Sequence, residues 1–304
     1  MLHHLSDAPG IGGAIKGEPE DFVVEEITAE GRRLAFGKRV RGRDERGGEY
    51  ARFVLEKREW NTPQALQEIA SRLRVGQKRF GYAGTKDRRA VTVQLCSAWG
   101  VEPEAFKALG IPGVKVNGAW RARQGVRLGD LSGNAFTIRV RGARPRSAQA
   151  VKKIFGELRG AFPNYFGSQR FGSVRANTHL VGKAILRGDL EGAAKNYLCF
   201  TEGETNAEAL SARARLAKEM DFGEAVEYFP RHLKYERAML LHLAEVKNDY
   251  AGALRSLPRG ILLMFVHAFQ SMLWNEALSE RISAGETAPA RGDFVCPRNR
   301  FGFP

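Results

Sequence analysis

One carboxylate stands alone among basic residues in the first third of the chain. Between Glu68 and Glu102 the single acidic side chain is Asp87, and the basic residues of that stretch are Arg72, Arg74, Lys78, Arg79, Lys86, Arg88 and Arg89. Because nearby positive charge favours the ionised form of a carboxyl group, we expect Asp87 to carry a negative charge. Such a carboxylate can act as a nucleophile or as a general base beside a polyanion. The alternative is a solvated hairpin with a local ion pair, which is the commoner reason for an aspartate in such a turn.

Short strands and a tight turn are expected to position this residue. The sequence predicts a strand over 79–83, a turn over 84–89 and a second strand over 91–97. Thr62 and Pro63 open a helix, as its cap and as its first helical residue. The other elements expected in this half are strands over 22–26, 50–58 and 133–141, a short helix over 102–109 and a mobile basic loop over 31–48.

The pattern changes near Pro145. Ser147 is expected to cap a helix that runs to about Arg159. Apolar residues at helical spacing then predict further helices over 176–186, 190–200, 207–220, 233–246 and 260–283. The predicted fold class is therefore α/β (α+β), in which a mixed, mainly antiparallel sheet domain over 1–160 precedes a mostly helical domain over 161–304.

Composition limits the partners and the compartment. The 304 residues carry a formal net charge of +14, which favours polyanionic partners, nucleic acid before a membrane surface. No apolar run reaches the length of a membrane span and no secretory signal is present. The cysteines, Cys96, Cys199 and Cys296, lie far apart, which argues against a zinc site or a disulfide framework and fits the cytoplasm. No phosphate-binding glycine motif occurs, so we expect no cofactor and no metal, and nothing demands more than a monomer.

One segment interleaves aromatic residues with polar ones. Residues 164–172 contain three aromatic residues, among them Phe166, together with Gln169 and Arg170. Aromatic and arginine side chains can stack on unpaired bases, which predicts an RNA contact. The alternative is that this segment forms a packed joint between the two domains, and the two interpretations are compatible.

A second pair of residues offers a similar combination. Asn134 and Phe136 lie two residues apart in a predicted strand, so their side chains share one face. The amide could bind a base edge and the ring could cover the flat side of the base. The alternative is that Asn134 only begins the strand and that Phe136 fills the core.

Four motifs in the same order resemble those of the TruD family of tRNA pseudouridine synthases. They are 15–25 (IKGEPEDFVVE), 84–94 (GTKDRRAVTVQ), 131–138 (LSGNAFTI) and 164–172 (NYFGSQRFG). The segment 265–275 (FVHAFQSMLWN) also resembles a helix of that family. The resemblance implies a catalytic α/β domain around an antiparallel sheet, with a helical domain inserted. It also implies conversion of uridine to pseudouridine in tRNA, typically at position 13.

The resemblance assigns roles to individual residues. Asp87 is implied as the catalytic aspartate, Lys16 as its basic partner and Phe136 as the ring that stacks on the target uracil, while Asn134 would hold the loop or the base. The other residues expected to bind substrate are Glu25, Lys86, Arg88, Phe166, Gln169 and Arg170. The reaction breaks the bond between sugar and uracil nitrogen and rejoins the base through carbon 5. It needs neither a metal nor a redox cofactor.

The chain departs from the family pattern at its end. Family members return to the catalytic domain with a further strand and helix, whereas this chain ends at Pro304, shortly after Asp293. The resemblance then implies an incomplete insertion, an absent returning segment and an unpaired sheet edge, which would lower stability and turnover. Two alternatives to an active synthase stay open: a catalytically impaired RNA-binding or RNA-folding protein of this fold, and a structural ribosome-associated protein.

Overall fold

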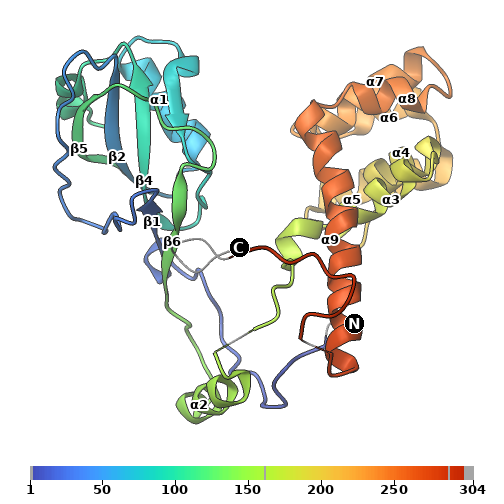
Figure 1. Ribbon diagram of the computed structural model, residues 1–304. Coiled ribbons are helices and arrows are strands. Elements are labelled where there is room, and N and C mark those ends of the chain that lie inside the picture. The colour runs from blue at the N-terminus through green and yellow to red at the C-terminus, as the bar shows by residue number, and fades with distance from the viewer. Residues whose placement is uncertain (1–2, 161, 287, 298–304) are drawn as a thin grey trace. The chain divides into compact units, whose positions relative to one another are not determined.

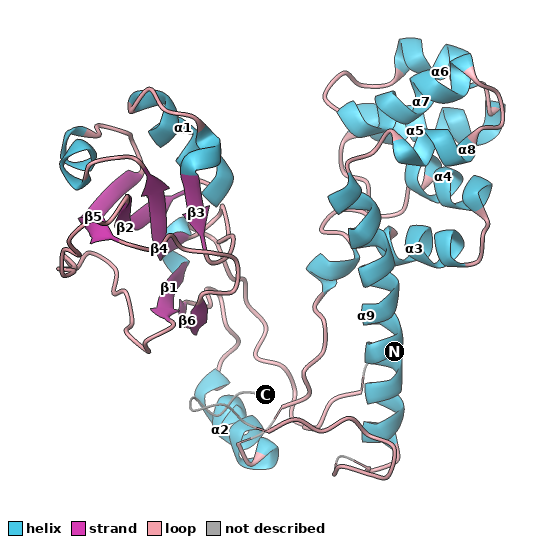
Figure 2. Cartoon of the chain, turned by 45° about the horizontal axis from the view of Figure 1, so that its top comes forward, coloured by secondary structure: helices cyan, strands magenta, loops and turns pink. Residues whose placement is uncertain are grey.

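The computed structural model describes residues 3–160, 162–286 and 288–297, and the chain forms two compact units. The first is built mainly from residues 8–153 and contains the strands, so we call it the sheet unit. The second is built mainly from residues 154–293, and we call it the helical unit. Figure 1 labels five strands of the sheet unit and helices α3–α9 of the helical unit, and Figure 2, which colours helices and strands differently, also labels β3.

A six-stranded mixed sheet forms the centre of the sheet unit. Its strands are β1 (Phe22–Thr28), β2 (Tyr50–Arg58), β3 (Phe80–Tyr82), β4 (Val91–Trp99), β5 (Val114–Ala122) and β6 (Leu131–Ile138). The strand order is β5-β2-β4-β1-β6, and β3 also pairs with β4. The pairing of β1 with β4 is parallel and the others are antiparallel. The prediction of a mixed, mainly antiparallel sheet is thus confirmed.

The central strand β4 has different neighbours at its two ends. Strand β2 pairs along the whole of β4, from Val91 to Trp99. Strand β1 pairs only with residues 91–93, and β3 pairs only with residues 96–98. Because a strand rises about 3.3 Å per residue, the two ends of β4 lie about 26 Å apart. The turn that contains Asp87 leads into the end beside β1.

Each face of the sheet buries its own apolar cluster. One cluster lies against α1 (Thr62–Arg72), and its buried members include Phe53, Leu55, Leu66 and Ile69. The other lies beneath the loop between β1 and β2, and its buried members include Leu34, Val40, Val54 and Val93. Alternate residues of β2 supply the two clusters, as expected for a strand covered on both faces. The sheet is therefore a rigid support for the turns at its edges.

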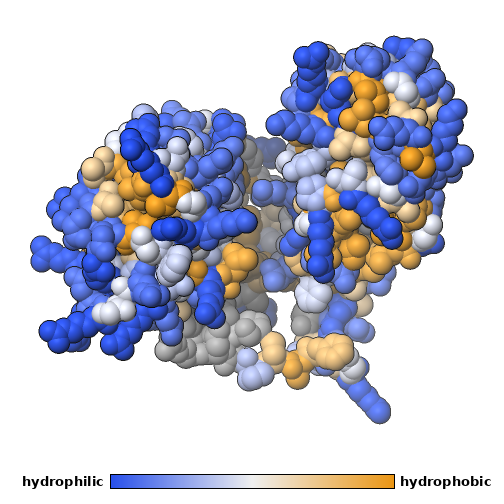
Figure 3. Space-filling model, turned by 90° about the horizontal axis from the view of Figure 1, so that it is seen from above, coloured by the Kyte–Doolittle hydropathy of each residue, from blue (hydrophilic) through white to orange (hydrophobic). Residues whose placement is uncertain are grey.

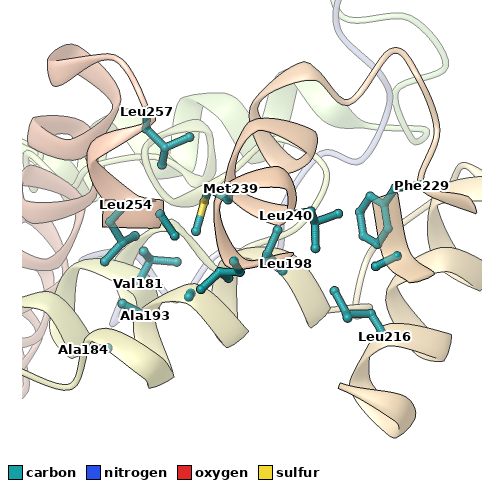
Figure 4. Close-up of a cluster of buried hydrophobic side chains, with 14 of the residues drawn as sticks. Val181, Ala184, Ala193, Leu198, Leu216, Phe229, Met239, Leu240, Leu254 and Leu257 are labelled. Carbon is teal, nitrogen blue, oxygen red and sulfur yellow. The ribbon is translucent and has the colours of Figure 1, made fainter. Parts of the chain in front are cut away.

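The helical unit is built from packed helices. Its α-helices are α3 (Thr178–Leu186), α4 (Leu190–Cys199), α5 (Ala207–Glu219), α6 (Phe222–Tyr228), α7 (Lys234–Glu245), α8 (Tyr250–Arg255) and α9 (Arg259–Ser283). Helix α2 (Ser147–Leu158) contains the boundary between the two units and buries none of its residues. Figure 4 shows Val181, Leu198 and Met239, from three different helices, within one buried cluster. Helices α3 and α9 approach closely at Gly182, where an added Cβ would lie 2.0 Å from the Phe265 carbonyl oxygen. A glycine is required there because any side chain would separate the two helices.

The structure also corrects several expectations about individual elements. Asn61, and not Thr62, caps α1, because the Asn61 side chain accepts a hydrogen bond from the Gln64 N–H at 2.8 Å. The loop over 31–48, expected to be mobile and basic, packs two buried apolar side chains, Leu34 and Val40, against the sheet. The elements that sequence patterns missed are β5, α6 and α8.

The surface of both units is largely polar. In Figure 3, hydrophilic side chains cover much of the displayed face of each unit, with smaller apolar areas between them. Among the described residues, no helix is long and apolar enough to cross a lipid bilayer. The 25-residue α9, the longest of the described helices, contains charged and polar residues along its length.

Candidate active site

The Asp87 carboxylate lies in the turn between β3 and β4, where Lys16 reaches it. The Lys16 Nζ donates a hydrogen bond to Asp87 Oδ1 at 2.8 Å, and the two side chains are 26% and 33% exposed. An ammonium group at this distance stabilises and orients the charge of the carboxylate. The pair is formed but remains open to solvent, so a ligand can approach the carboxylate.

The backbone near Lys16 is held by a buried carboxylate. Lys16 has a φ of +60°, a left-handed conformation that few residues other than glycine adopt. Five residues later, the buried Asp21 side chain accepts hydrogen bonds from Arg141 Nε at 2.6 Å and from the Glu18 N–H at 3.0 Å. The Arg141 guanidinium and then the Glu18 N–H hold the pKa of Asp21 below its ordinary value. The segment before β1 is thereby fixed, and it carries Lys16.

Two aromatic rings adjoin the Lys16–Asp87 pair. The Lys16 Nζ lies 4.1 Å from the centroid of the Phe22 ring, a cation–π contact. Phe22 meets Phe136 edge-on, with ring centroids 5.9 Å apart. Phe136 lies opposite Val24 in the β1–β6 pairing and is 56% exposed, so much of its ring is free. Carboxylate, ammonium and an accessible ring therefore form one continuous group.

A second lysine, Lys57, binds backbone carbonyl groups of the turn that contains Asp87. Lys57 on β2 is buried, and its ammonium donates hydrogen bonds to the carbonyl oxygens of Trp60 at 2.6 Å, Asp87 at 2.9 Å and Lys86 at 3.3 Å. Burial lowers the pKa of Lys57 to about 8, although the Asp87 charge acts in the opposite direction. The ammonium thus holds the backbone of Asp87 itself.

The residue before Asp87 points into the protein. The buried Lys86 Nζ pairs with Glu26 Oε2 on β1 at 2.7 Å, and Glu26 Oε1 accepts the Leu95 N–H at 2.9 Å. The Lys86 N–H donates to Thr62 Oγ1 at 3.0 Å. Removing either charge would leave the other buried and unpaired, which is costly. Lys86, expected to bind substrate, is placed here as an internal support of the turn.

Thr62, which was expected to cap α1, belongs to the same network of hydrogen bonds instead. The Thr62 hydroxyl donates to Gln94 Oε1 at 2.7 Å, and Gln94 Nε2 donates to the Gly84 carbonyl at 3.0 Å. Both side chains are buried. The start of the turn at Gly84 and the residue before Asp87 are therefore tied to α1 and β4 by side chains.

Asn134 and Arg88 lie near this group in different environments. Asn134 lies opposite Glu26 in the β1–β6 pairing, on the same face of β6 as Phe136. Its Oδ1 is buried and, in the part of the chain that the structure describes, accepts no hydrogen bond. Arg88, next to Asp87, is exposed. The Arg88 guanidinium, which pairs with none of the described residues, is accessible to a ligand, whereas the enclosed Asn134 oxygen is not.

Glu25 lies on the face of the sheet opposite to the one that carries Phe22 and Phe136. Side chains alternate along β1, so Glu25 points to the face opposite to that of Phe22 and Glu26. Its carboxylate accepts the Arg33 guanidinium and the Phe36 N–H, the latter at 2.7 Å. Glu25, expected to bind substrate, is thus occupied in holding the loop between β1 and β2.

The remaining residues that were expected to bind substrate, Phe166, Gln169 and Arg170, belong to the helical unit. The Asn275 side chain of α9 accepts the Phe166 N–H and donates to the Phe166 carbonyl, each at 2.9 Å. The Arg170 guanidinium lies 5.1 Å from the Phe166 ring centroid. Phe166, Gln169 and Arg170 are all exposed. The segment is therefore fixed through its backbone and keeps polar and aromatic side chains at the surface.

Sequence reasoning missed three side chains of this group. Lys57, Glu26 and Phe22 all come from strands that were predicted correctly, but none was singled out. The available signal was a lysine and a glutamate next to apolar residues in these strands, since a charge that is buried requires a partner. Among the described residues, no three His, Cys, Asp or Glu side chains gather closely enough to hold a metal ion.

Known proteins share this combination of sequence and fold. The family model described as tRNA pseudouridine synthase D (TruD) matches residues 1–302. The chain belongs to the TruD family. The TruD-family protein of Methanosarcina mazei, a probable tRNA pseudouridine synthase D, is 39% identical over 308 residues, or 99% of this chain and 68% of that protein. A probable tRNA pseudouridine synthase D 1 of Methanocaldococcus jannaschii is 40% identical over 300 residues, or 97% of this chain and 75% of that protein.

A solved TruD structure agrees with the fold described above. The crystal structure of the putative tRNA pseudouridine synthase D of Methanosarcina mazei matches with a TM-score of 0.79 at 38% sequence identity. The match covers 100% of this chain and 68% of that chain. The mixed α/β fold, with its six-stranded sheet and helical region, is therefore a TruD fold, and the resemblance seen in the motifs is confirmed.

Proposed function

We propose that this TruD-family tRNA pseudouridine synthase, an isomerase, uses Asp87 as its catalytic carboxylate. The observation that carries the proposal is the 2.8 Å contact between Lys16 and Asp87 beside an exposed Phe136. In that arrangement the sheet unit is the catalytic domain and the helical unit is the family's inserted domain. The family resemblance supports the uridine at position 13 of tRNA as the target.

The reaction moves one bond within the nucleotide. The bond between sugar C1′ and uracil N1 breaks, the base turns, and C1′ forms a bond to C5. The proton on C5 then leaves and N1 gains a proton, so the product is an isomer of the substrate. The Asp87 carboxylate either adds to the base or the sugar during the rearrangement, or removes the C5 proton. Lys16 orients this carboxylate, and the Lys57 and Glu26–Lys86 contacts hold its backbone.

The detached base must be retained while it turns. Phe136 offers an open ring for stacking, and its edge contact with Phe22 limits its movement. Asn134, on the same face of β6, can hold the loop or the base. Extruding a uridine from its stack costs a few kcal/mol, which phosphate contacts made by basic residues such as Arg88 can offset.

Incubation with unmodified tRNA tests this proposal. The native chain is expected to form pseudouridine, mapped by its position in the tRNA, whereas Asp87→Asn is expected to form none and to bind tRNA with similar affinity. Asn has the size of Asp, so a folding defect is not expected. Product from Asp87→Asn at the native rate would refute the catalytic role. Binding of tRNA without product from the native chain would instead favour the RNA-binding protein of the same fold.

A further inference from the structure

A hollow lies at the end of β4 that is far from the Asp87 turn. It has a volume of about 540 Å³ and is lined by residues from the ends of β2, β3 and β4 and from the segment 123–127. Tyr50 pairs with Trp99 in the β2–β4 ladder, and Phe80 of β3 pairs with Ala98. The Asp87 turn precedes the opposite end of β4, so the two sites lie about 26 Å apart along the strand.

An aromatic side chain lies at this end of the sheet. Trp99 is 47% exposed, and the Arg79 guanidinium lies 5.4 Å from its ring centroid. The Trp99 indole N–H donates to Glu49 Oε2 at 3.3 Å, which fixes the orientation of the ring. A half-exposed indole with a guanidinium over its ring can stack with a flat base on the part of the ring that remains exposed.

The wall of the hollow is closely packed. The Val126 N–H donates to Ser97 Oγ at 2.8 Å. An added Cβ at Gly125 would lie 2.7 Å from the Tyr50 ring, and one at Gly81 would lie 2.3 Å from the Val126 carbonyl oxygen. Because these glycines permit such close approach, the segment 123–127 is held against the strand ends and the hollow is preformed.

The hollow carries excess positive charge. Its basic residues are Lys78, Arg79, Arg123 and Arg127. In the part of the chain that the structure describes, the side chains of Lys78 and Arg127 form no ion pair. The three nearby carboxylates each accept a hydrogen bond: Glu49 from the Trp99 indole, Glu45 from the Arg123 N–H and Asp130 from the Arg127 N–H. Free cations around an aromatic platform suit a base with its flanking phosphates better than they suit a neutral ligand.

We propose that this hollow binds an unpaired nucleotide of the RNA whose target uridine reaches Asp87. The base stacks on Trp99, and Lys78 and Arg127 contact the adjoining phosphates. The identity of the RNA as tRNA rests on the proposed function, whereas the stacking site itself does not. The hollow then acts as a second contact point that helps to select RNAs long enough to reach both ends of β4.

Binding measurements without turnover test the proposal. The affinity of the Asp87→Asn protein for unmodified tRNA is measured by fluorescence anisotropy, with and without Trp99→Ala, at several salt concentrations. Trp99→Ala is expected to weaken binding by about 10-fold, the effect of losing one stacked base, and Trp99→Phe is expected to retain most of the affinity. Lys78→Ala is expected to lower the salt dependence by about one phosphate contact, whereas Lys115→Ala, an exposed lysine outside the hollow, is not. Equal affinity of the Trp99→Ala and Trp99→Phe proteins for tRNA would overturn the proposal.

RNA length supplies the second part of the test. A short RNA that contains the target uridine but spans less than about 20 Å is expected to bind the Trp99→Ala and parent proteins equally well, because it cannot reach from one end of β4 to the other. An equal loss for short and full-length RNA would contradict the proposed location. Polyglutamate and oligouridylate are also compared as competitors of tRNA binding. If polyglutamate displaces tRNA as well as oligouridylate does, and only when Trp99 is present, the hollow would be assigned to acidic peptides instead. Trp99-dependent binding with no pseudouridine from the native chain refutes only the proposed function, and pseudouridine formation with Trp99-independent binding refutes only this inference.

Discussion

Replacing Lys57 by methionine should separate the support of Asp87 from its chemistry. Methionine has similar length but no charge and no donor. At neutral pH the Lys57 ammonium holds the carbonyl oxygens of Trp60, Lys86 and Asp87. The variant therefore leaves Asp87, Lys16 and Phe136 unchanged in type while it releases the backbone that presents Asp87. A loss of turnover would then come from position and not from the removal of a reacting group.

The structure gives the size of the competing effects. Burial lowers the pKa of Lys57 from an ordinary 10.5 to about 8, a shift that corresponds to a cost of about 3 kcal/mol for burying the ammonium. Lys57→Met removes this cost, but it leaves up to three carbonyl groups without their donor, at about 1–3 kcal/mol each. We expect a net destabilisation of about 1–3 kcal/mol. Turnover should fall by on the order of 100-fold, because a displacement of about 1 Å at a reacting group has that effect.

The pH dependence gives a sharper signature, because stability and turnover should move in opposite directions. Above pH 8 the folded protein releases the Lys57 proton while the unfolded chain keeps it. The free energy of unfolding therefore increases as the pH is raised between about 8 and about 10.5. Turnover should fall over the same pH range, because a neutral amine has two N–H groups for three carbonyl oxygens.

Single-turnover rates between pH 6 and 10, together with urea unfolding at each pH, measure both effects. In Lys57→Met the rise in stability above pH 8 should disappear. The part of the alkaline fall in rate that comes from Lys57 deprotonation should disappear as well, whereas any part that comes from titration of the RNA should persist. Lys115→Met, which changes an exposed lysine of the same unit, serves as the control. A rate for Lys57→Met equal to that of the native chain at pH 7, or an unchanged alkaline limb, would refute the role assigned to Lys57.

Other predictions follow from single contacts. Phe136→Ala should lower turnover at least 10-fold with little loss of tRNA affinity, because the exposed ring faces a base only after extrusion; unchanged single-turnover rates would remove its stacking role. Glu236→Gln should destabilise the protein by about 2 kcal/mol in urea unfolding, because it removes the carboxylate 2.6 Å from the buried Arg213, which keeps the more distant Glu204 carboxylate at 3.4 Å; an unchanged midpoint would contradict this. The pKa of Asp21 is lowered chiefly by Arg141, so its stabilising contribution is present above pH 3.8 and is lost at lower pH. Asp21→Asn should therefore flatten the acid limb of stability, and an identical limb would count against that contact.

Short local motifs were enough to name three residues that the structure brings together. Asp87, Lys16 and Phe136 were each named from motif residues, and the structure brings them into one group. Lys57 was missed for a physical reason. Its partners are backbone carbonyl groups, one of them three residues away at Trp60 and two about thirty residues away at Lys86 and Asp87, and no side-chain pattern indicates which carbonyls a lysine will meet. Its burial follows from the pairing of β2 with β4, which periodicity alone does not specify.

The errors in the fold have similar causes. Strand β5 contains Asn117-Gly118, a pair typical of turns, and the structure places an irregularity in the β2–β5 pairing there, with Gly118 at a φ of +155°. A bulge and a turn share the same residue preferences, so the strand was not recognised. Helices α6 and α8 have seven and six residues, too few for a helical period to stand out.

The most direct test of the account is the release of the C5 proton from the target uridine. In tRNA labelled with tritium at uracil C5, pseudouridine formation releases the label to water. We expect the native chain to release it and Asp87→Asn to release none, while Lys57→Met releases it slowly and Lys115→Met at the native rate. Release by Asp87→Asn at the native rate would contradict the claim that this carboxylate, held by Lys16 and Lys57, performs the reaction.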